Sequence, residues 1–333
     1  MLRLSARIVI IFAIVWSVWW IMGQQIITRG LPTWLEDRRT EGWQAEAETS
    51  VAGFPLTWRA TFPELLLADP DTGLVWEAPG FQLSAPSYAP TRVTATWPGT
   101  QTLASPIEKI TVEADVMRGH LGVLPNADMT LDASEITLEA VSLTGSTGWT
   151  ASLDSGALST ARLSDAPLTH DIQFSAKNLR PAEELMSAVD PAGLMPRILA
   201  EFTLDVEAGF DRPWDRAAIE VRRPQFTAID LTNLSVRWGD MALEAAGQFT
   251  VDTDGAPDGR VEIRATNWRE MLALGQATGA VPENVVPLLE TLLTALSEAS
   301  GNPDTLDAPL IFREGRATFG GLPLPFRADL TIR

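Results

Sequence analysis

The first 29 residues constrain this chain most, because they include an apolar stretch that few soluble folds can use. Residues 8–22 carry no charge and follow two arginines, Arg3 and Arg7. This apolar core of 15 residues is shorter than the roughly 20 residues that a transmembrane helix needs. Gln24 and Gln25 interrupt the core, but Ile26 and Ile27 extend it, so a span from about Leu4 to Ile27 is feasible. We therefore predict a transmembrane anchor over residues 1–29.

The main alternative for this segment is a signal peptide that is cleaved after export. Cleavage requires small residues at the first and third positions before the cut, and the stretch WWIMGQQIITRG has no such pattern. Trp16, Trp19 and Trp20 lie at helical spacing near the far end of the apolar core, where interfacial aromatic residues gather. We therefore favour an uncleaved anchor over a cleaved signal or a buried soluble helix.

The orientation of the anchor depends on the charges that flank it. Arg3 and Arg7 lie on one side, but Arg29, Arg38 and Arg39 lie on the other. The positive-inside comparison is therefore close to a tie. The order of a basic start and an apolar core is that of an export signal, which favours an N-terminus inside the cell and a body outside the cytoplasm.

Net charge and composition exclude several classes of function. The chain has 43 acidic and 25 basic residues, a net charge of −18, and no acid precedes Glu36. From residue 30 onward 22 basic residues face 43 acidic ones, or −21. A nucleic-acid binder needs a basic surface, so that class is excluded. The absence of cysteine removes disulfides, cysteine metal sites and thiol catalysis.

Beyond the anchor, the sequence alternates between apolar and polar residues. We predict a juxtamembrane helical linker over residues 30–42, followed by one β-rich domain over residues 43–333. Residues 56–62 and 110–116 show the period of two that marks a sheet with one apolar and one wet face. Turn residues separate such stretches, as in Asp252-Thr-Asp-Gly255. The predicted fold is mainly β with minor α, built as a large antiparallel sheet.

Two helical insertions are expected to interrupt this sheet. The first covers Pro181–Leu199 and contains Pro191 and Pro196, which would divide it. The second covers Trp268–Ser300 and is broken near Gly279–Pro282. Its last part carries leucines at helical spacing and is amphipathic. We expect this apolar face to cap one end of the sheet, with contact to a membrane surface as the alternative.

An internal repeat relates two segments of the body, approximately residues 129–200 and 227–300. Leu131-Asp-Ala-Ser-Glu-Ile-Thr-Leu138 matches Ile229-Asp-Leu-Thr-Asn-Leu-Ser-Val236, and Ala176-Lys-Asn-Leu-Arg180 matches Ala265-Thr-Asn-Trp-Arg269. Repeats of one supersecondary unit commonly extend a shared sheet. We predict that Asn178 and Asn267 cap the helices that follow them.

The motifs of common enzyme classes are missing from the sequence. There is no G-x-S-x-G, P-loop or dinucleotide fingerprint. His120 and His170 are expected to be surface or sheet residues. Asp252, Asp254 and Asp258 have the wrong spacing for an EF-hand and fit a hairpin turn better. The sequence has 43 acidic residues and does not exclude a catalytic pair of carboxylates of the glycosidase type. We expect no enzymatic activity, no cofactor and no metal site.

Aromatic residues are concentrated between residues 58 and 97. A packed core is one explanation, and the lining of an open apolar groove is the other, because strands with small and aromatic inward residues can curve without closing. The groove candidates are Trp58, Phe62, Trp76, Phe81 and Trp97, with Tyr88 nearby.

Three motifs follow the short anchor: Val51-Ala-Gly-Phe-Pro55, Leu67-Ala-Asp-Pro-Asp-Thr-Gly-Leu74 and Trp76-Glu-Ala-Pro79. With these motifs the chain resembles, over essentially its whole length, an uncharacterised alphaproteobacterial family, domain of unknown function 2125 (DUF2125). The C-terminal half more loosely resembles AsmA-like envelope proteins through Gly247–Ile263 and the following Asn267. The resemblance implies an inner-membrane anchor, a periplasmic groove-shaped sheet and a role in lipid handling. It supplies no catalytic residues.

Three functions follow as hypotheses. The first is a non-enzymatic periplasmic protein that binds lipid or another apolar ligand in envelope maintenance. The second is an interaction scaffold for another envelope protein in envelope assembly. A hydrolase that uses carboxylates is the third. The expected partners are the membrane, through the N-terminal helix, and lipid acyl chains or an envelope protein, but not nucleic acid.

Overall fold

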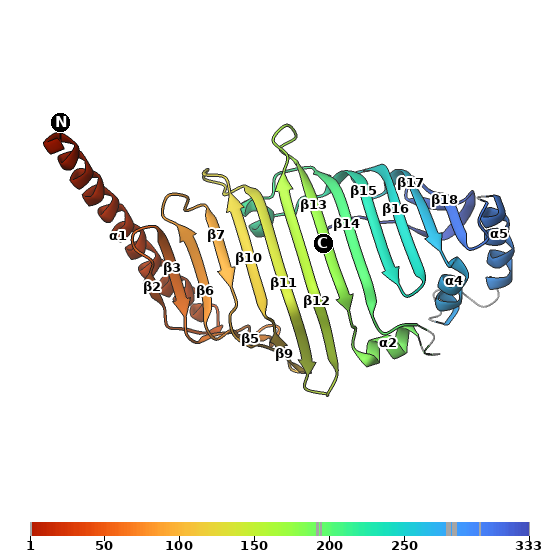
Figure 1. Ribbon diagram of the computed structural model, residues 1–333, viewed down its shortest axis with the longest axis horizontal. Helices are drawn as coiled ribbons and strands as arrows, with labels where there is room; N and C mark the ends of the chain where they lie inside the picture. Colours follow the sequence, from red (N-terminus) through yellow and green to blue (C-terminus); the bar gives the residue numbers. More distant parts are fainter. Residues whose placement is uncertain are drawn as a thin grey trace. The chain divides into compact units, whose positions relative to one another are not determined.

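The computed structural model describes residues 2–190, 193, 195–277, 281, 285–299 and 301–332. The chain divides into two compact units. Unit 1 comprises Met1–Val123 and Leu138–Gly148, and unit 2 comprises Leu124–Thr137 and Trp149–Arg333. Strands predominate in both units, and the pairings of the described strands are antiparallel (Figure 1). These features confirm the predicted fold class, mainly β with minor α and antiparallel.

Unit 1 begins with one long helix, α1 (Leu2–Thr40), which covers both the predicted anchor and the predicted linker. The helix is long and apolar enough to cross a membrane. It continues through Pro32, although proline removes one helical hydrogen bond. Leu31 and Leu35 on either side of Pro32 pack against the body, which helps to offset that loss. The limit between anchor and linker stays a prediction.

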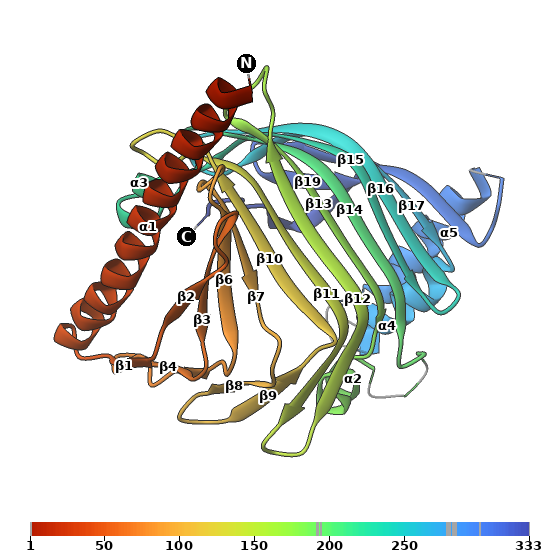
Figure 2. The ribbon, with the colours of Figure 1, turned by 60° about the vertical axis from the view of Figure 1, so that its left-hand side comes forward.

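The strands of unit 1 form two antiparallel ladders (Figure 2). One ladder runs β2–β3–β6–β7–β10. The other runs β1–β4–β5–β8–β9 and continues to the end of β11. The bounds are β1 (Gln44–Ala47), β2 (Ser50–Ala52), β3 (Thr57–Phe62), β4 (Leu65–Ala68), β5 (Val75–Glu77), β6 (Phe81–Pro86), β7 (Arg92–Thr96), β8 (Gln101–Ala104), β9 (Lys109–Glu113), β10 (Val116–Val123) and β11 (Leu131–Gly145).

The core of unit 1 draws on both ladders and on α1. Phe62 and Phe81 from the first ladder and Leu65 from the second are buried together. Ile27 and Leu31 of α1 pack against the same cluster. The inward residues are those that alternate with polar ones along β3, as expected for a sheet with one apolar face.

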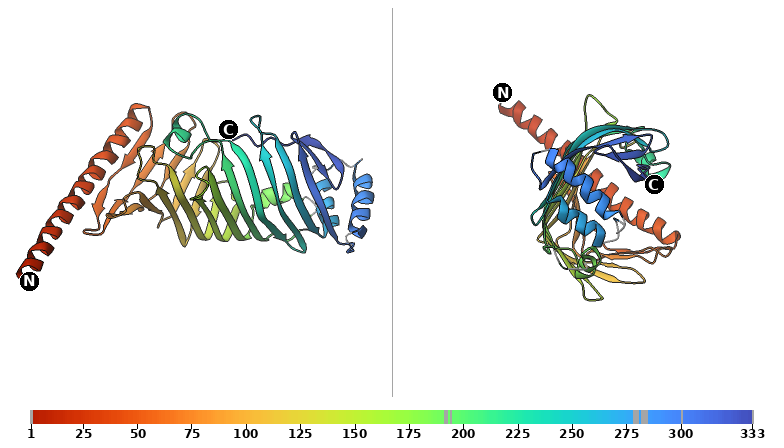
Figure 3. Two further views of the ribbon diagram at one scale, coloured as in Figure 1. Left: turned by 90° about the horizontal axis from the view of Figure 1, so that it is seen from above. Right: turned by 90° about the vertical axis from the view of Figure 1, so that its right-hand side faces the viewer.

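Unit 2 is an antiparallel meander in which each strand pairs with the next (Figure 3). Short turns join several of its consecutive strands, as the sequence predicted, whereas longer segments that contain helices separate others. The bounds are β12 (Thr150–Arg162), β13 (Thr169–Leu179), β14 (Leu199–Phe210), β15 (Phe226–Trp238), β16 (Met241–Val251), β17 (Pro257–Thr266), β18 (Thr305–Arg313), β19 (Arg316–Phe319) and β20 (Leu322–Arg327).

Helices interrupt this meander at both predicted insertions. The first insertion contains α2 (Glu183–Val189), and the second contains α4 (Trp268–Ala277) and α5 (Val286–Ala299), which lie beside each other in Figure 3. Leu293 and Leu296 of α5 pack against the cluster of Trp268 and Leu306, so this helix covers the sheet as predicted. Pro191 lies outside the described residues, as do residues 279, 280 and 282 of the predicted break. Sequence patterns missed the short α3 (Arg216–Glu220).

The predicted capping role of the two repeat asparagines is wrong for Asn178. This residue lies in β13, its side-chain amide donates to Asp154, and Ala182 occupies the N-cap position of α2. Asn267 directly precedes α4, but its side-chain amide donates to the carbonyl of Asp240. Both asparagines share positive φ angles of 52° and 56°, a left-handed conformation that asparagine tolerates better than most residues. The two segments therefore share a backbone conformation at this position.

Candidate functional site: an apolar cavity in unit 1

The middle of α1, at residues 16–20, is attached to the sheet of unit 1 by indole hydrogen bonds. Three tryptophans of α1 donate to carbonyls at the strand ends, and a tryptophan of β3 donates back to α1. Each bond uses the one polar atom of an otherwise apolar ring, so the contact stays apolar around it. The four bonds are Trp16 Nε1 to Pro55 O (2.8 Å), Trp19 Nε1 to Ser87 O (2.8 Å), Trp20 Nε1 to Thr57 O (3.0 Å) and Trp58 Nε1 to Trp20 O (2.9 Å).

Gly23 sets how closely α1 approaches the sheet. A Cβ at this position would lie 2.1 Å from a ring carbon of Trp58, a separation that no real contact reaches. Glycine therefore lets the buried Trp58 ring lie directly against the helix backbone. The ring centroids of Trp19 and Trp58 are 5.8 Å apart at this contact.

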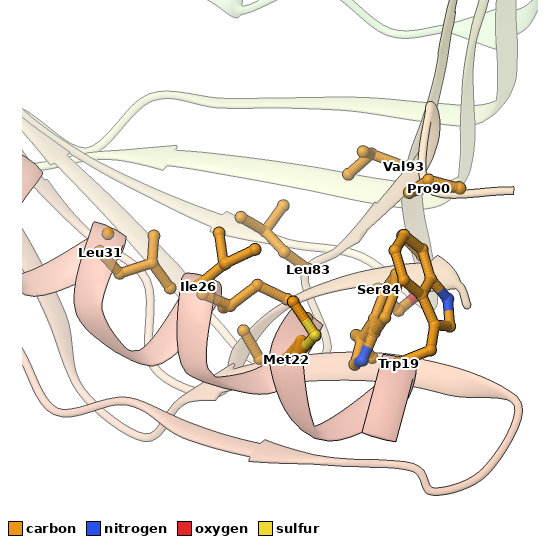
Figure 4. Close-up of a pocket in the computed structure, with 14 residues that line it drawn as sticks. Trp19, Met22, Ile26, Leu31, Leu83, Ser84, Pro90 and Val93 are labelled. Carbon is orange, nitrogen blue, oxygen red and sulfur yellow. The ribbon is translucent and has the colours of Figure 1, made fainter. Parts of the chain in front are cut away.

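A cavity of about 510 Å³ lies beside this contact, between α1 and the strands β3, β6 and β7. Figure 4 shows Met22, Ile26 and Leu31 on the helix side and Leu83 and Val93 on the sheet side. Its volume falls in the range of about 300–1,000 Å³ that is typical of small-molecule sites. The described lining residues include no titratable side chain, and Ser84 contributes their single hydroxyl group.

Gly30 gives the cavity part of its space. It lines the cavity, and a Cβ at this position would meet no atom within 4 Å. A side chain could therefore extend from position 30 without displacing another residue. Gly23 and Gly30 lie two helical turns apart on one face, so one glycine permits contact and the other leaves space.

The structure separates the five predicted groove residues. Trp58 lines the cavity. The other four lie together in the core, with Phe81 at the centre. The ring centroids of Phe62, Trp76 and Trp97 lie 5.6, 5.8 and 5.3 Å from that of Phe81. These four residues are therefore part of the packed core, which was the other explanation of the aromatic cluster.

Sequence reasoning missed the helix side of the cavity, because it assigned that segment to the anchor and linker. The signal was nevertheless present. Apolar residues and glycines continue past Gln24 and Gln25 at the spacing i, i+3, i+4, i+7 of one helix face. The residues on this face are Trp19, Met22, Gly23, Ile26, Ile27, Gly30 and Leu31.

A second cavity, of about 430 Å³, lies within unit 2 and has a mixed lining. Asp190, Asp240 and Glu270 contribute carboxyl groups to it, and Trp238 contributes apolar surface. The carboxylate of Asp190 accepts a hydrogen bond of 2.7 Å from the backbone N–H of Met195, so this acid helps to hold its own loop. The unit 1 cavity is the better candidate for a binding site, because its lining has a single chemical character.

Comparison with known families gives one match. The model of a family described as "Uncharacterized protein conserved in bacteria (DUF2125)" matches residues 19–325, so the chain belongs to this family. The match confirms that part of the sequence resemblance, whereas the looser resemblance to AsmA-like proteins stays a prediction. Neither the curated proteins nor the solved structures gave a match.

Proposed function

We propose that this member of the DUF2125 family is a non-enzymatic envelope protein that binds an acyl chain in the unit 1 cavity. In this proposal α1 anchors the chain in the bacterial inner membrane, and the body lies in the periplasm. The observation that carries the proposal is that the anchor helix itself forms one wall of an apolar cavity. A ligand from the membrane would thus meet the site beside the anchor.

The chemistry of the lining suits a hydrocarbon chain. Each methylene group that leaves water contributes about 0.8 kcal/mol. At about 30 Å³ per group of the size of a water molecule, a cavity of about 510 Å³ would hold about 17 such groups. This is the scale of one acyl chain. A polar or charged ligand would find few side-chain partners, because the described lining has one hydroxyl group, that of Ser84, and the indole N–H groups of Trp19 and Trp58 already donate to backbone carbonyls.

A substitution that fills the cavity tests this proposal. Gly30→Phe places a ring in the open space, and Gly30→Ala is the matched control that leaves most of that space free. The full chain is purified in detergent and examined by native mass spectrometry. We expect retained lipid on the wild type and on Gly30→Ala, and a several-fold loss on Gly30→Phe. Lipids that surround the anchor helix are common to all three proteins.

Equal lipid retention by the three proteins would contradict the proposal. The interaction scaffold is then the function to test, by crosslinking the wild type in its own membrane. A single dominant protein partner in place of crosslinked lipid would support the scaffold. Circular dichroism of Gly30→Phe shows whether the variant keeps its β-structure, so that loss of lipid is not confused with unfolding.

A further inference from the structure

We propose that two loops at one end of the unit 1 sheet insert into the membrane leaflet nearest the body. The loops, residues 53–56 and 87–91, are called the tip loops. Inserted in this way, they would place the mouth of the cavity among lipid chains, so that a chain enters from the leaflet without crossing water. The inference rests on the membrane-spanning role of α1 in the proposed function.

The tip loops form one connected surface. Residues 53–56 lead into the start of β3, and residues 87–91 follow the end of β6. Thr57 lies opposite Pro86 at this end of the sheet. The backbone N–H of Ser87 donates to the carbonyl of Leu56 (2.9 Å), and its hydroxyl donates to the carbonyl of Pro55 (3.0 Å). The two loops therefore share one position at the end of the sheet.

This surface is apolar and uncovered. Phe54, Leu56 and Tyr88 are 56%, 59% and 70% exposed. Residues 49–58 and 78–91 contain no charged side chain, although a fifth of the chain is charged. A contiguous apolar surface of this kind marks contact with a membrane or another protein.

Contacts with α1 fix the height of the tip loops relative to the anchor. Trp16 donates to Pro55 in the first tip loop, and Trp19 donates to Ser87 in the second. Gln24 is the first polar residue after the exposed apolar part of the helix that includes these tryptophans and Met22. Trp16 precedes Gln24 by eight residues, or about 12 Å along a helix. If Gln24 lies at the edge of the hydrocarbon, the tip loops lie below that edge.

The strands give a second and shallower estimate of this depth. The first charged residues beyond the tip loops are Arg59 on β3 and Arg92 on β7, and both are exposed. Leu56 precedes Arg59 by three residues, or about 10 Å along a strand. Arginines at this height would meet the lipid phosphates, while the tips reach the boundary between headgroups and chains. Apolar segments that bind membranes are typically buried by about 5–10 Å.

A crevice of about 430 Å³ lies between the tip loops and the part of α1 that precedes the main cavity. Phe12, Val15 and Trp16 line its helix side, and Tyr88 and Pro90 line its loop side. Trp19 and Pro90 line both this crevice and the main cavity. The shared residues make the two spaces neighbours, which gives a lipid chain an apolar route from the leaflet to the cavity.

The absence of cysteine from the chain allows this depth to be measured with single labels. Phe54→Cys and Tyr88→Cys are labelled with a small environment-sensitive fluorophore in the full chain and placed in phosphatidylethanolamine–phosphatidylglycerol vesicles. The matched control is Ile107→Cys, which is 93% exposed in the turn between β8 and β9 of unit 1. We expect lipid-attached nitroxides to quench both tip labels several-fold more strongly than the control, and iodide in the water to do the reverse.

Iodide quenching of the tip labels at the level of the control would overturn the inference. So would tip fluorescence that is shielded from iodide but not quenched by nitroxide lipids, since this pattern indicates a second copy or a protein at the tips. Repeating the measurement in Gly30→Phe separates the two proposals. Deep tip labels in a protein that retains no lipid would leave the tip insertion standing and reject the cavity. Tip labels exposed to water, together with a loss of lipid in Gly30→Phe, would reject the tip insertion and support the cavity.

Discussion

His170 is a buried side chain that should make the stability of unit 2 depend on pH. It is 2% exposed in β13, its Nδ1 shares a hydrogen bond of 3.2 Å with the Thr160 hydroxyl, and its ring lies edge-on to Phe210. Burial lowers the pKa of His170, and the nearby Arg162 lowers it further, while Asp132 opposes this effect. The neutral ring is therefore the form that the fold favours.

This preference predicts a loss of stability in mild acid. The unfolded chain binds a proton at His170 near the ordinary pKa of about 6.5, whereas the folded chain binds it only at lower pH. The free energy of unfolding should therefore fall as the pH drops from about 7.5 to about 5.5.

Thermal unfolding in detergent should show this loss of stability in the wild type and in His120→Gln, an exposed control. His170→Gln should lose most of it. Asp154 and Asp211, whose pKa values are lowered, stay ionised over this range. An unchanged pH response in His170→Gln would show that other groups carry it.

Asn267 makes a prediction about backbone conformation. Its φ of 56° suits glycine and asparagine. Asn267→Gly keeps this conformation but loses the hydrogen bond to the Asp240 carbonyl, whereas Asn267→Val loses both. We expect the valine variant to be less stable than the glycine variant by about 1–2 kcal/mol. Denaturant unfolding of the two variants measures the difference, and equal midpoints would contradict a left-handed residue at this position.

At the scale of the element, α1 serves two purposes along one helix. Its N-terminal part presents exposed apolar side chains, as a membrane-spanning segment would. From Trp16 onward the same helix is bonded to the sheet, and its Ile27 and Leu31 enter the core of unit 1. The helix α1 is therefore an integral part of the unit 1 fold and forms one wall of its cavity.

The two glycines on this face of α1 should respond in opposite ways to the same substitution. Gly23→Ala forces a methyl group against the Trp58 ring and should destabilise the protein by about 1–3 kcal/mol. Gly30→Ala meets open space and should stabilise it by about 0.5–1 kcal/mol, because alanine favours a helix over glycine. Thermal unfolding of the full chain in detergent compares them. A neutral Gly23→Ala would mean that α1 does not pack closely on β3.

At the scale of the whole molecule, the charge distribution separates the anchor from the body. The net charge from residue 30 onward is −21, and in the proposed function this charge would repel the body from anionic headgroups. The tip loops depart from this pattern, since they are uncharged and exposed. Membrane contact in the proposal is thus confined to α1 and this one end of the unit 1 sheet.

The proposed topology can be tested with fusions at the C-terminus of the full chain. A reporter enzyme that is active only outside the cytoplasm should be active, and one that is active only in the cytoplasm should be silent. The physical reason is the basic start before an apolar core, which resembles an export signal. The reverse result would place the body in the cytoplasm and reject the periplasmic proposal.

Local periodicity in the sequence was sufficient to predict several elements. The apolar run of α1, the alternation along strands such as β3, and the amphipathic face of α5 were all visible before any contact was known. The repeat asparagines were also visible, but the wrong property was inferred for Asn178. Both helix capping and left-handed backbone favour asparagine, so residue type alone does not separate them.

Which apolar residues form the core and which line the cavity depends on contacts between distant parts of the chain. Trp58 and Phe62 are equivalent in the alternating pattern of β3, yet one meets α1 and the other meets Phe81. The contacts that separate them join residues 38 and 19 positions apart in the chain. Local periodicity does not predict such pairs, because the hydrophobic effect is non-directional and any apolar surface that excludes water can pack on an apolar face. Gly23 permits close contact between α1 and Trp58, and Gly30 leaves space two turns later, so these two glycines determine where α1 packs and where the cavity lies.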